Sequence, residues 1–148
     1  MNSSHYAIRE AHVQAALANA TAAQVGALQA LLAMVRELED LERTLPERCG
    51  QARRAAGIEV PALSKAARYA VAQSDDARRD YDRLLTRRCN RATTAQAVVR
   101  ELLDTAQNDL ELTQMLDDGN PDDPVNALIG DLCENKRRFV ERLRAFLD

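Results

Sequence analysis

The chain has 148 residues and a formal net charge of −3, and its aromatic residues are three Tyr and two Phe, with no Trp. Five Gly, four Pro and three Cys are too few for a β-sandwich, a glycine-rich nucleotide loop or a disulfide scaffold. The small net charge gives no global attraction to nucleic acid or membrane. With 26 Ala among the 148 residues, the composition predicts an all-α protein of one domain.

The first predicted helix spans residues 4–45 and follows a coiled-coil rhythm with spacings of four and three. One seam position holds the residues Tyr6, Val13, Ala20, Ala27, Met34 and Leu41. Pro46 is expected to end or kink this helix, since proline lacks a backbone N–H. Residues 46–61 are therefore expected to form a connector that contains a short helical turn before Gly57.

The second predicted helix spans residues 62–118 and ends where Gly119, Asn120 and Pro121 interrupt the pattern. Its apolar seam slips between Arg88 and Ala92, which is typical of a stutter. The sequence leaves two alternatives open: one continuous long helix, or a helix broken near this slip.

The third predicted helix spans residues 124–147, with Asp123 as N-cap and Pro124 at the first helical position. Its apolar stripe includes one charged residue, Lys136. The stripe consists of Val125, Ile129, Leu132, Lys136, Phe139, Leu143 and Phe146.

Short connections favour an elongated, antiparallel three-helix hairpin or bundle with coiled-coil-like seams. The second hairpin would place Leu132 near Leu110 and Phe139 near Leu103. Large side chains of all three helices would then meet at one level: Tyr6, Ile8, Val98, Val99, Leu102, Leu103, Phe139, Val140, Leu143 and Phe146. A compact bundle with a helix broken near Arg88 to Ala92 is the other solution.

The first helix is longer than the third can cover, so part of its seam is expected to stay exposed in a monomer. The candidate partner-binding residues there are Leu28, Leu31, Leu32, Met34 and Val35. A second copy of the chain or a partner helix would cover them.

An arginine run without any acid extends from residue 83 to residue 100. Three of its members step by four along one helical face. The candidate binding residues are Arg83, Arg87, Arg88 and Arg91, read either as a solvated face or as a surface for an acidic partner or nucleic-acid phosphate. Tyr81 is the one aromatic nearby, which disfavours nucleic acid.

The sequence contains no enzyme signature. His5 and His12 are seven residues apart, too far along one helix to share a metal ion, so no metal or other cofactor is predicted. The three cysteines, Cys49, Cys89 and Cys133, lack metal-ligand spacing. Cys89 and Cys133 are expected to be small buried residues, and Cys49, near the hairpin tip, is the one expected to be exposed. Acidic pairs such as Asp117 and Asp118 are adjacent rather than convergent.

Two architectural resemblances concern secretion. The long hairpin with leucine-rich seams looks like the helical export chaperones of flagellar and type III secretion systems. The turn at residues 120–124, followed by an apolar-striped helix, is similar to the turn of type III needle subunits over fewer than thirty residues. Both imply a secretion-linked helical assembly, and neither transfers a functional residue.

The sequence therefore predicts a non-enzymatic helical interaction protein, an adaptor or chaperone that binds a protein partner or itself. The alternatives are a small inhibitor or immunity protein, contacting its target through the acidic surface from Asp104 to Asp123, and phosphate binding through the arginines. Neither a signal peptide nor a membrane span is predicted, and the absence of paired cysteines favours a reducing bacterial cytoplasm.

Overall fold

The computed structural model describes residues 8–58 and 65–148, and in the second range the side chains of residues 65–75, 77 and 78 fall outside the description. Five α-helices and no strand occur in these ranges, which confirms the all-α class: α1 (Glu10–Ala18), α2 (Ala22–Ala55), α3 (Lys65–Arg91), α4 (Ala95–Gln114) and α5 (Val125–Leu147). None of these helices is both long and apolar enough to cross a membrane within the described ranges.

The first predicted helix, residues 4–45, is in fact two helices, and the expectation of one continuous element is wrong. The chain leaves the helical path at Asn19 and Ala20 and starts again at Thr21, whose N–H donates to Gln24 Oε1 at 3.0 Å. This Thr-x-x-Gln segment is a local N-terminal signal. The turn lets α1 fold back against α2.

Pro46 does not end the helix, and the predicted connector 46–61 is helical as far as Ala55. The lost backbone hydrogen bond is offset by packing on both sides of Pro46, because Leu45 and Cys49 are buried against α5. Helix α2 ends where Gly57 adopts a φ of 75° and Ile58 N–H reaches Arg53 O at 2.9 Å. This is the Schellman arrangement that glycine favours.

The predicted helix 62–118 is broken at the seam slip, so the broken alternative is the one observed. Helix α3 ends at Arg91, and Thr94 caps α4 by accepting a hydrogen bond from Ala97 N–H at 3.1 Å. Helix α5 begins at Val125, one residue after the expected start, so its N-cap is Pro124 rather than the predicted Asp123, whose Oδ1 accepts a hydrogen bond from Val125 N–H.

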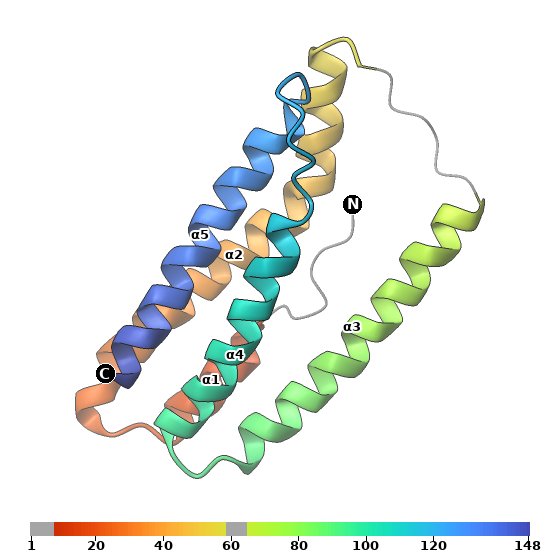
Figure 1. Ribbon diagram of the computed structural model, residues 1–148. Coiled ribbons are helices and arrows are strands. Elements are labelled where there is room, and N and C mark those ends of the chain that lie inside the picture. The colour runs from red at the N-terminus through yellow and green to blue at the C-terminus, as the bar shows by residue number, and fades with distance from the viewer. Residues whose placement is uncertain (1–7, 59–64) are drawn as a thin grey trace.

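The helices are arranged around α4 and α5, which lie antiparallel (Figure 1). Helix α2 packs along α5, and α1 fills the space between α2, α3 and α4 in the lower half of the view. In the described part of the chain helix α3 packs mainly against α1 and α4, so the expected hairpin of two long helices is not confirmed. Its expected contacts at residues 65–75 lie outside the described side chains.

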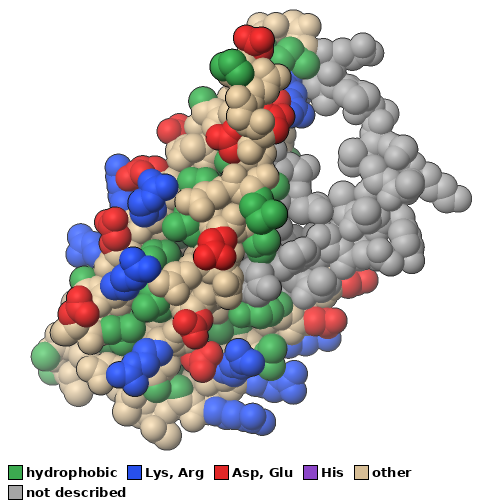
Figure 2. Space-filling model, viewed as in Figure 1, with side chains coloured by type: hydrophobic (Ala, Val, Ile, Leu, Met, Phe, Trp, Pro, Cys, Tyr) green, Lys and Arg blue, Asp and Glu red, His purple; other side chains and the backbone are tan. Residues whose placement is uncertain are grey.

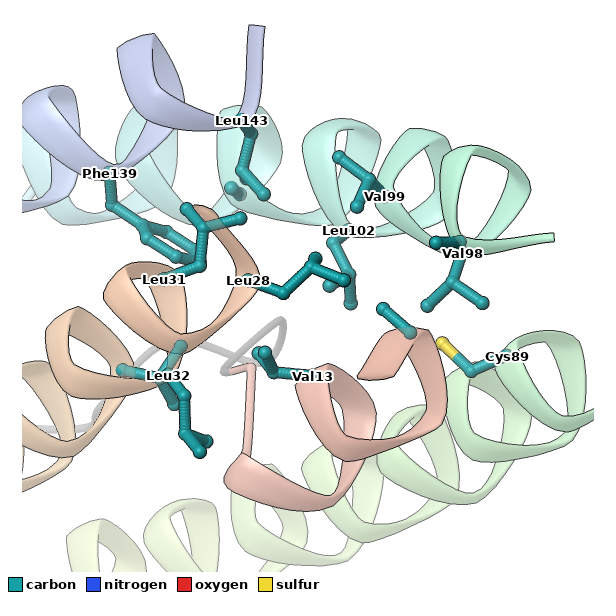
Figure 3. Packing of buried hydrophobic residues seen from close by; sticks show 14 of the residues in the cluster. Val13, Leu28, Leu31, Leu32, Cys89, Val98, Val99, Leu102, Phe139 and Leu143 are labelled. Carbon is teal, nitrogen blue, oxygen red and sulfur yellow. The ribbon is translucent and has the colours of Figure 1, made fainter. Parts of the chain in front are cut away.

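The main core lies at the level predicted from the large side chains. Nine of the ten predicted residues belong to or pack against one cluster, and Tyr6 lies outside the described residues. Leu28 of α2 lies between Val13 of α1 and Leu102 of α4 (Figure 3). A second cluster joins Leu45 and Cys49 of α2 to the first half of α5, including Leu132, and Leu110 of α4 packs against this cluster.

Replacing Leu28 by alanine should lower the free energy of unfolding by about 2–5 kcal/mol, because the fully buried side chain would leave a cavity. The matched change Leu84→Ala on α3, at a leucine that is 37% exposed, should cost less than about 1 kcal/mol. Urea unfolding of both variants measures the difference. Equal, small costs would mean that Leu28 is not a core residue.

Candidate functional site

The predicted leucine-rich seam is part of the interior. Leu28, Leu31, Leu32 and Val35 are at most 8% exposed, and Met34 is half-buried against the same cluster. The expectation that this seam stays exposed is wrong, because the turn at Asn19 to Thr21 lays α1 over α2 and α5 covers the other side. Among the described residues, the large apolar side chains that stay exposed are the separate Ile58, Leu84 and Met115.

The four predicted arginines, by contrast, are all exposed at the end of α3. Arg83 lies 3.6 Å from Asp80, and Arg88 lies 3.8 Å from Glu101 of α4. Arg87 and Arg91 form no ion pair within the described part of the chain. Because Arg83, Arg87 and Arg91 are spaced by four, they lie on one side of α3.

We call Arg83, Arg87, Arg88 and Arg91 the arginine face. It lies at the lower end of the molecule, where Lys and Arg side chains gather near the α3–α4 turn (Figure 2). No Asp, Glu, Lys or Arg occurs between Ala11 and Val35, the segment that forms α1 after its first residue and the start of α2. This segment therefore supplies no carboxylate to the face, and among the described residues Glu101 of α4 is the carboxylate that a neighbouring helix contributes, to Arg88.

A buried charge cluster, which the sequence analysis missed, joins three helices. Lys136 Nζ of α5 lies 2.6 Å from Glu42 Oε1 of α2 and 2.9 Å from Asp109 Oδ2 of α4. It also donates to Thr113 Oγ1 at 2.7 Å. These three acceptors match the three protons of an ammonium group.

The electrostatics of this cluster keep the lysine charged. Burial alone would lower the pKa of Lys136, but the carboxylates of Asp109 and Glu42 outweigh it and hold that pKa above its ordinary value. Burial raises the pKa of Glu42, against the opposing effect of Lys136. A lysine whose charged form is favoured and whose ammonium group has three acceptors is a poor nucleophile or base.

A cavity of about 20 Å³ lies beside the cluster, under the apolar side chains Val35, Leu38 and Phe139. That volume holds about one water molecule. Asp109 Oδ1 has no hydrogen-bond partner among the described residues. The space is too small for a substrate, and we interpret the cluster as a tie between helices.

His12 is also buried, at 2% exposure, and joins α1 to α3. Its Nδ1 accepts from Arg9 N–H at 2.9 Å, and its Nε2 lies 3.0 Å from Thr86 Oγ1. Arg9 also lies 3.6 Å from Asp82. Within the described ranges no group of three metal-ligating side chains occurs, and His5 lies outside them.

The three cysteines are free and buried, so the expectation that Cys49 is exposed is wrong. It lies 5% exposed against α5 because α2 continues past Pro46. Burial raises the pKa of the Cys89 thiol to about 11 and that of Cys49 in the same direction. Protonated, buried thiols are unreactive.

The acidic turn between α4 and α5 uses its carboxylates to hold its own backbone. Asp117 and Asp118 accept from Gly119 N–H and Asn120 N–H, and Asp118 also accepts from the Asn126 side chain. Arg53 of α2 donates to Asp123 Oδ2 at 2.9 Å. The two bonds from backbone N–H groups are Asx-type contacts that shape the turn, and the side-chain bonds tie it to α2 and α5.

Comparison with protein-family models, with curated proteins and with solved structures finds no match to this chain. The candidate site therefore depends on geometry alone.

Replacing Lys136 by methionine should lower the free energy of unfolding by about 3–5 kcal/mol, because Glu42 and Asp109 would remain buried without their cation. Adding Glu42→Leu and Asp109→Leu should recover most of that loss. The control Arg137→Met, at the exposed neighbour, should change stability by less than about 0.5 kcal/mol. A cost below about 1 kcal/mol for Lys136→Met in urea unfolding would contradict the buried cluster.

Proposed function

We propose that this chain is a non-enzymatic helical interaction protein, an adaptor that binds an acidic protein surface through the arginine face. The observation that carries the proposal is the exposure of Arg87 and Arg91 without an ion partner among the described residues. Exposed guanidinium groups bind carboxylates bidentately and with little desolvation cost. An acidic partner supplies carboxylates to Arg87 and Arg91, which have no ion partner among the described residues.

A protein partner is favoured over nucleic acid by the surroundings of the face. Tyr81, the nearest aromatic residue on α3, is half-buried against the core and lies 3.5 Å from Thr105 Oγ1, so it is not placed to stack on a base. The net charge of −3 also opposes a long polyanion.

The described polar groups best suited to catalysis are engaged in structure, which supports a binding role. Lys136 is bonded to three acceptors, His12 is buried between two helices, and the three thiols are buried. Leu28, Leu31 and Leu32 form part of the core, so they are not available as an exposed apolar seam for a dimer.

The double variant Arg87→Glu/Arg91→Glu should weaken partner binding at least about tenfold, equivalent to about 1.4 kcal/mol, because it replaces attraction by repulsion. The measurement is retention of host proteins on the immobilised chain, followed by titration of each retained protein at two salt concentrations. The affinity of the acidic partner should fall as salt rises.

The matched control is Arg43→Glu/Arg54→Glu, which makes the same charge change at exposed arginines of α2. Proteins lost with the first variant and kept with the control would support the face. Identical retention by all three chains would show a solvated surface instead. Loss of the retained material after nuclease treatment would assign the face to nucleic-acid phosphate.

A further inference from the structure

Helix α1 depends on its contacts with the rest of the bundle. It has nine residues, and a helix of that length is not stable alone in water. Its first turn is held from α2, where Glu39 Oε1 accepts from Glu10 N–H at 3.1 Å and Arg36 pairs with Glu10 at 2.6 Å. Its contacts with α3 include the His12–Thr86 hydrogen bond, the Arg9–Asp82 pair at its N-cap, and an apolar cluster that Val13 shares with Leu85.

The hydrogen bonds around His12 are satisfied by one form of the ring. Because Nδ1 accepts from Arg9 N–H, it carries no proton, and the single ring proton is on Nε2. That proton is donated to Thr86 Oγ1, whose own hydroxyl proton is donated to Asp82 O at 2.8 Å. The chain of bonds therefore requires a neutral imidazole.

A second proton would break this arrangement. It would add to Nδ1, where it would face the Arg9 N–H as donor against donor. The buried ring would also become a cation next to Arg9. The proton on Nδ1 removes the Arg9 N–H bond that starts α1, whereas Nε2–H still donates to Thr86 Oγ1, so the cost of keeping α1 on α3 is that of burying the cation.

The charges around His12 have opposing effects on its pKa, and burial of the ring is the largest effect. Burial lowers the pKa of His12, Asp82 of α3 raises it, and Arg9 lowers it. On α2, Glu39 and Arg36 are engaged with Glu10. On α4, Glu101 pairs with Arg88 and Asp109 with Lys136.

The direction of the pH effect follows from this lowered pKa. The unfolded or undocked chain, with an ordinary pKa near 6.5, binds the proton more readily than the docked one. The stabilising contribution is therefore fully present above pH 6.5 and is lost as pH falls through the docked value.

We propose that His12 is an acid-sensitive latch, and that a proton on Nδ1 releases α1 from α3 while α4 and α5 stay packed. Val13 and Ala16 of α1 are fully buried in the main core, so release uncovers their neighbours there. Leu28 is one of these, since it lies against Val13 (Figure 3). The inference is independent of the proposed function, because every readout is within the chain.

Amide hydrogen exchange between pH 7.5 and 5.0, corrected for the intrinsic rate, tests the latch on the full chain. The protection of amides 13–18 should fall by about tenfold for each pH unit between 6.5 and the docked pKa, since one proton is taken up on opening in that range, and should level off below it. Amides of α5 should keep their protection. Constant protection of α1, or an equal loss in α1 and α5, would overturn the proposal.

Two histidine variants separate the latch from carboxylate titration. In His12→Asn the amide oxygen takes the place of Nδ1 as acceptor from Arg9 N–H and does not titrate, so α1 protection should not change with pH. In His5→Asn the loss of protection at acidic pH should persist. A loss of protection at acidic pH in the His12→Asn variant like that of the unmodified chain would overturn the latch.

Nitrogen NMR of the unmodified chain keeps the test decisive if His12→Asn fails to fold. The ring of His12 should be the neutral Nε2–H form at pH 7.5, and its titration midpoint should coincide with the opening of α1. An Nδ1–H form, or a midpoint at or above 6.5, would contradict the proposal.

Discussion

The ammonium group of Lys136 fixes how helices α2, α4 and α5 meet, because it bonds to a carboxylate on each of the other two helices. It lies between the two apolar clusters, with Cys133 one turn before it in one cluster and Phe139 one turn after it in the other. Shifting α5 by a turn would separate Lys136 from Glu42 and Asp109 and leave charges buried without partners. Replacing a buried ion cluster by apolar residues is often neutral in energy, so its contribution is to the register more than to net stability.

With the register of α2, α4 and α5 set in this way, the alanine-rich composition explains the place of α1. Helices α2, α4 and α5 carry few aromatic side chains, and without α1 they would leave one side of the apolar cluster around Leu28 open. Helix α1 closes that side with Val13 and Ala16, both fully buried, and small side chains allow the helices to approach closely. The main apolar core is therefore completed by α1, a short helix that few polar contacts hold in place.

The same residues show what could be predicted from the sequence and what could not. Helix α5 was predictable because its apolar period and its Asp123–Pro124 start agree, and the break after Arg91 was signalled by the slip in the seam. The break at Thr21 was missed because the heptad pattern continues through it. Lys136 was visible as a charge within an apolar stripe, but its partner Glu42 is 94 residues earlier, and local periodicity gives no tertiary contact over that distance.

The arginine face was predictable for a different reason from the core. An arginine run without acids finds few intrachain partners when a segment beside it is free of carboxylates, as the segment from Ala11 to Val35 is, and Glu101 of α4 pairs with Arg88 alone among the four arginines. The leucine seam was misassigned because its cover is α1, which the heptad pattern had joined to α2. The described interior therefore uses its polar side chains to place helices: Lys136 fixes α5, and His12 fixes α1. Of the predicted binding residues, the arginine face remains accessible to a partner, and α1 is the element whose release would change which apolar residues the bundle exposes.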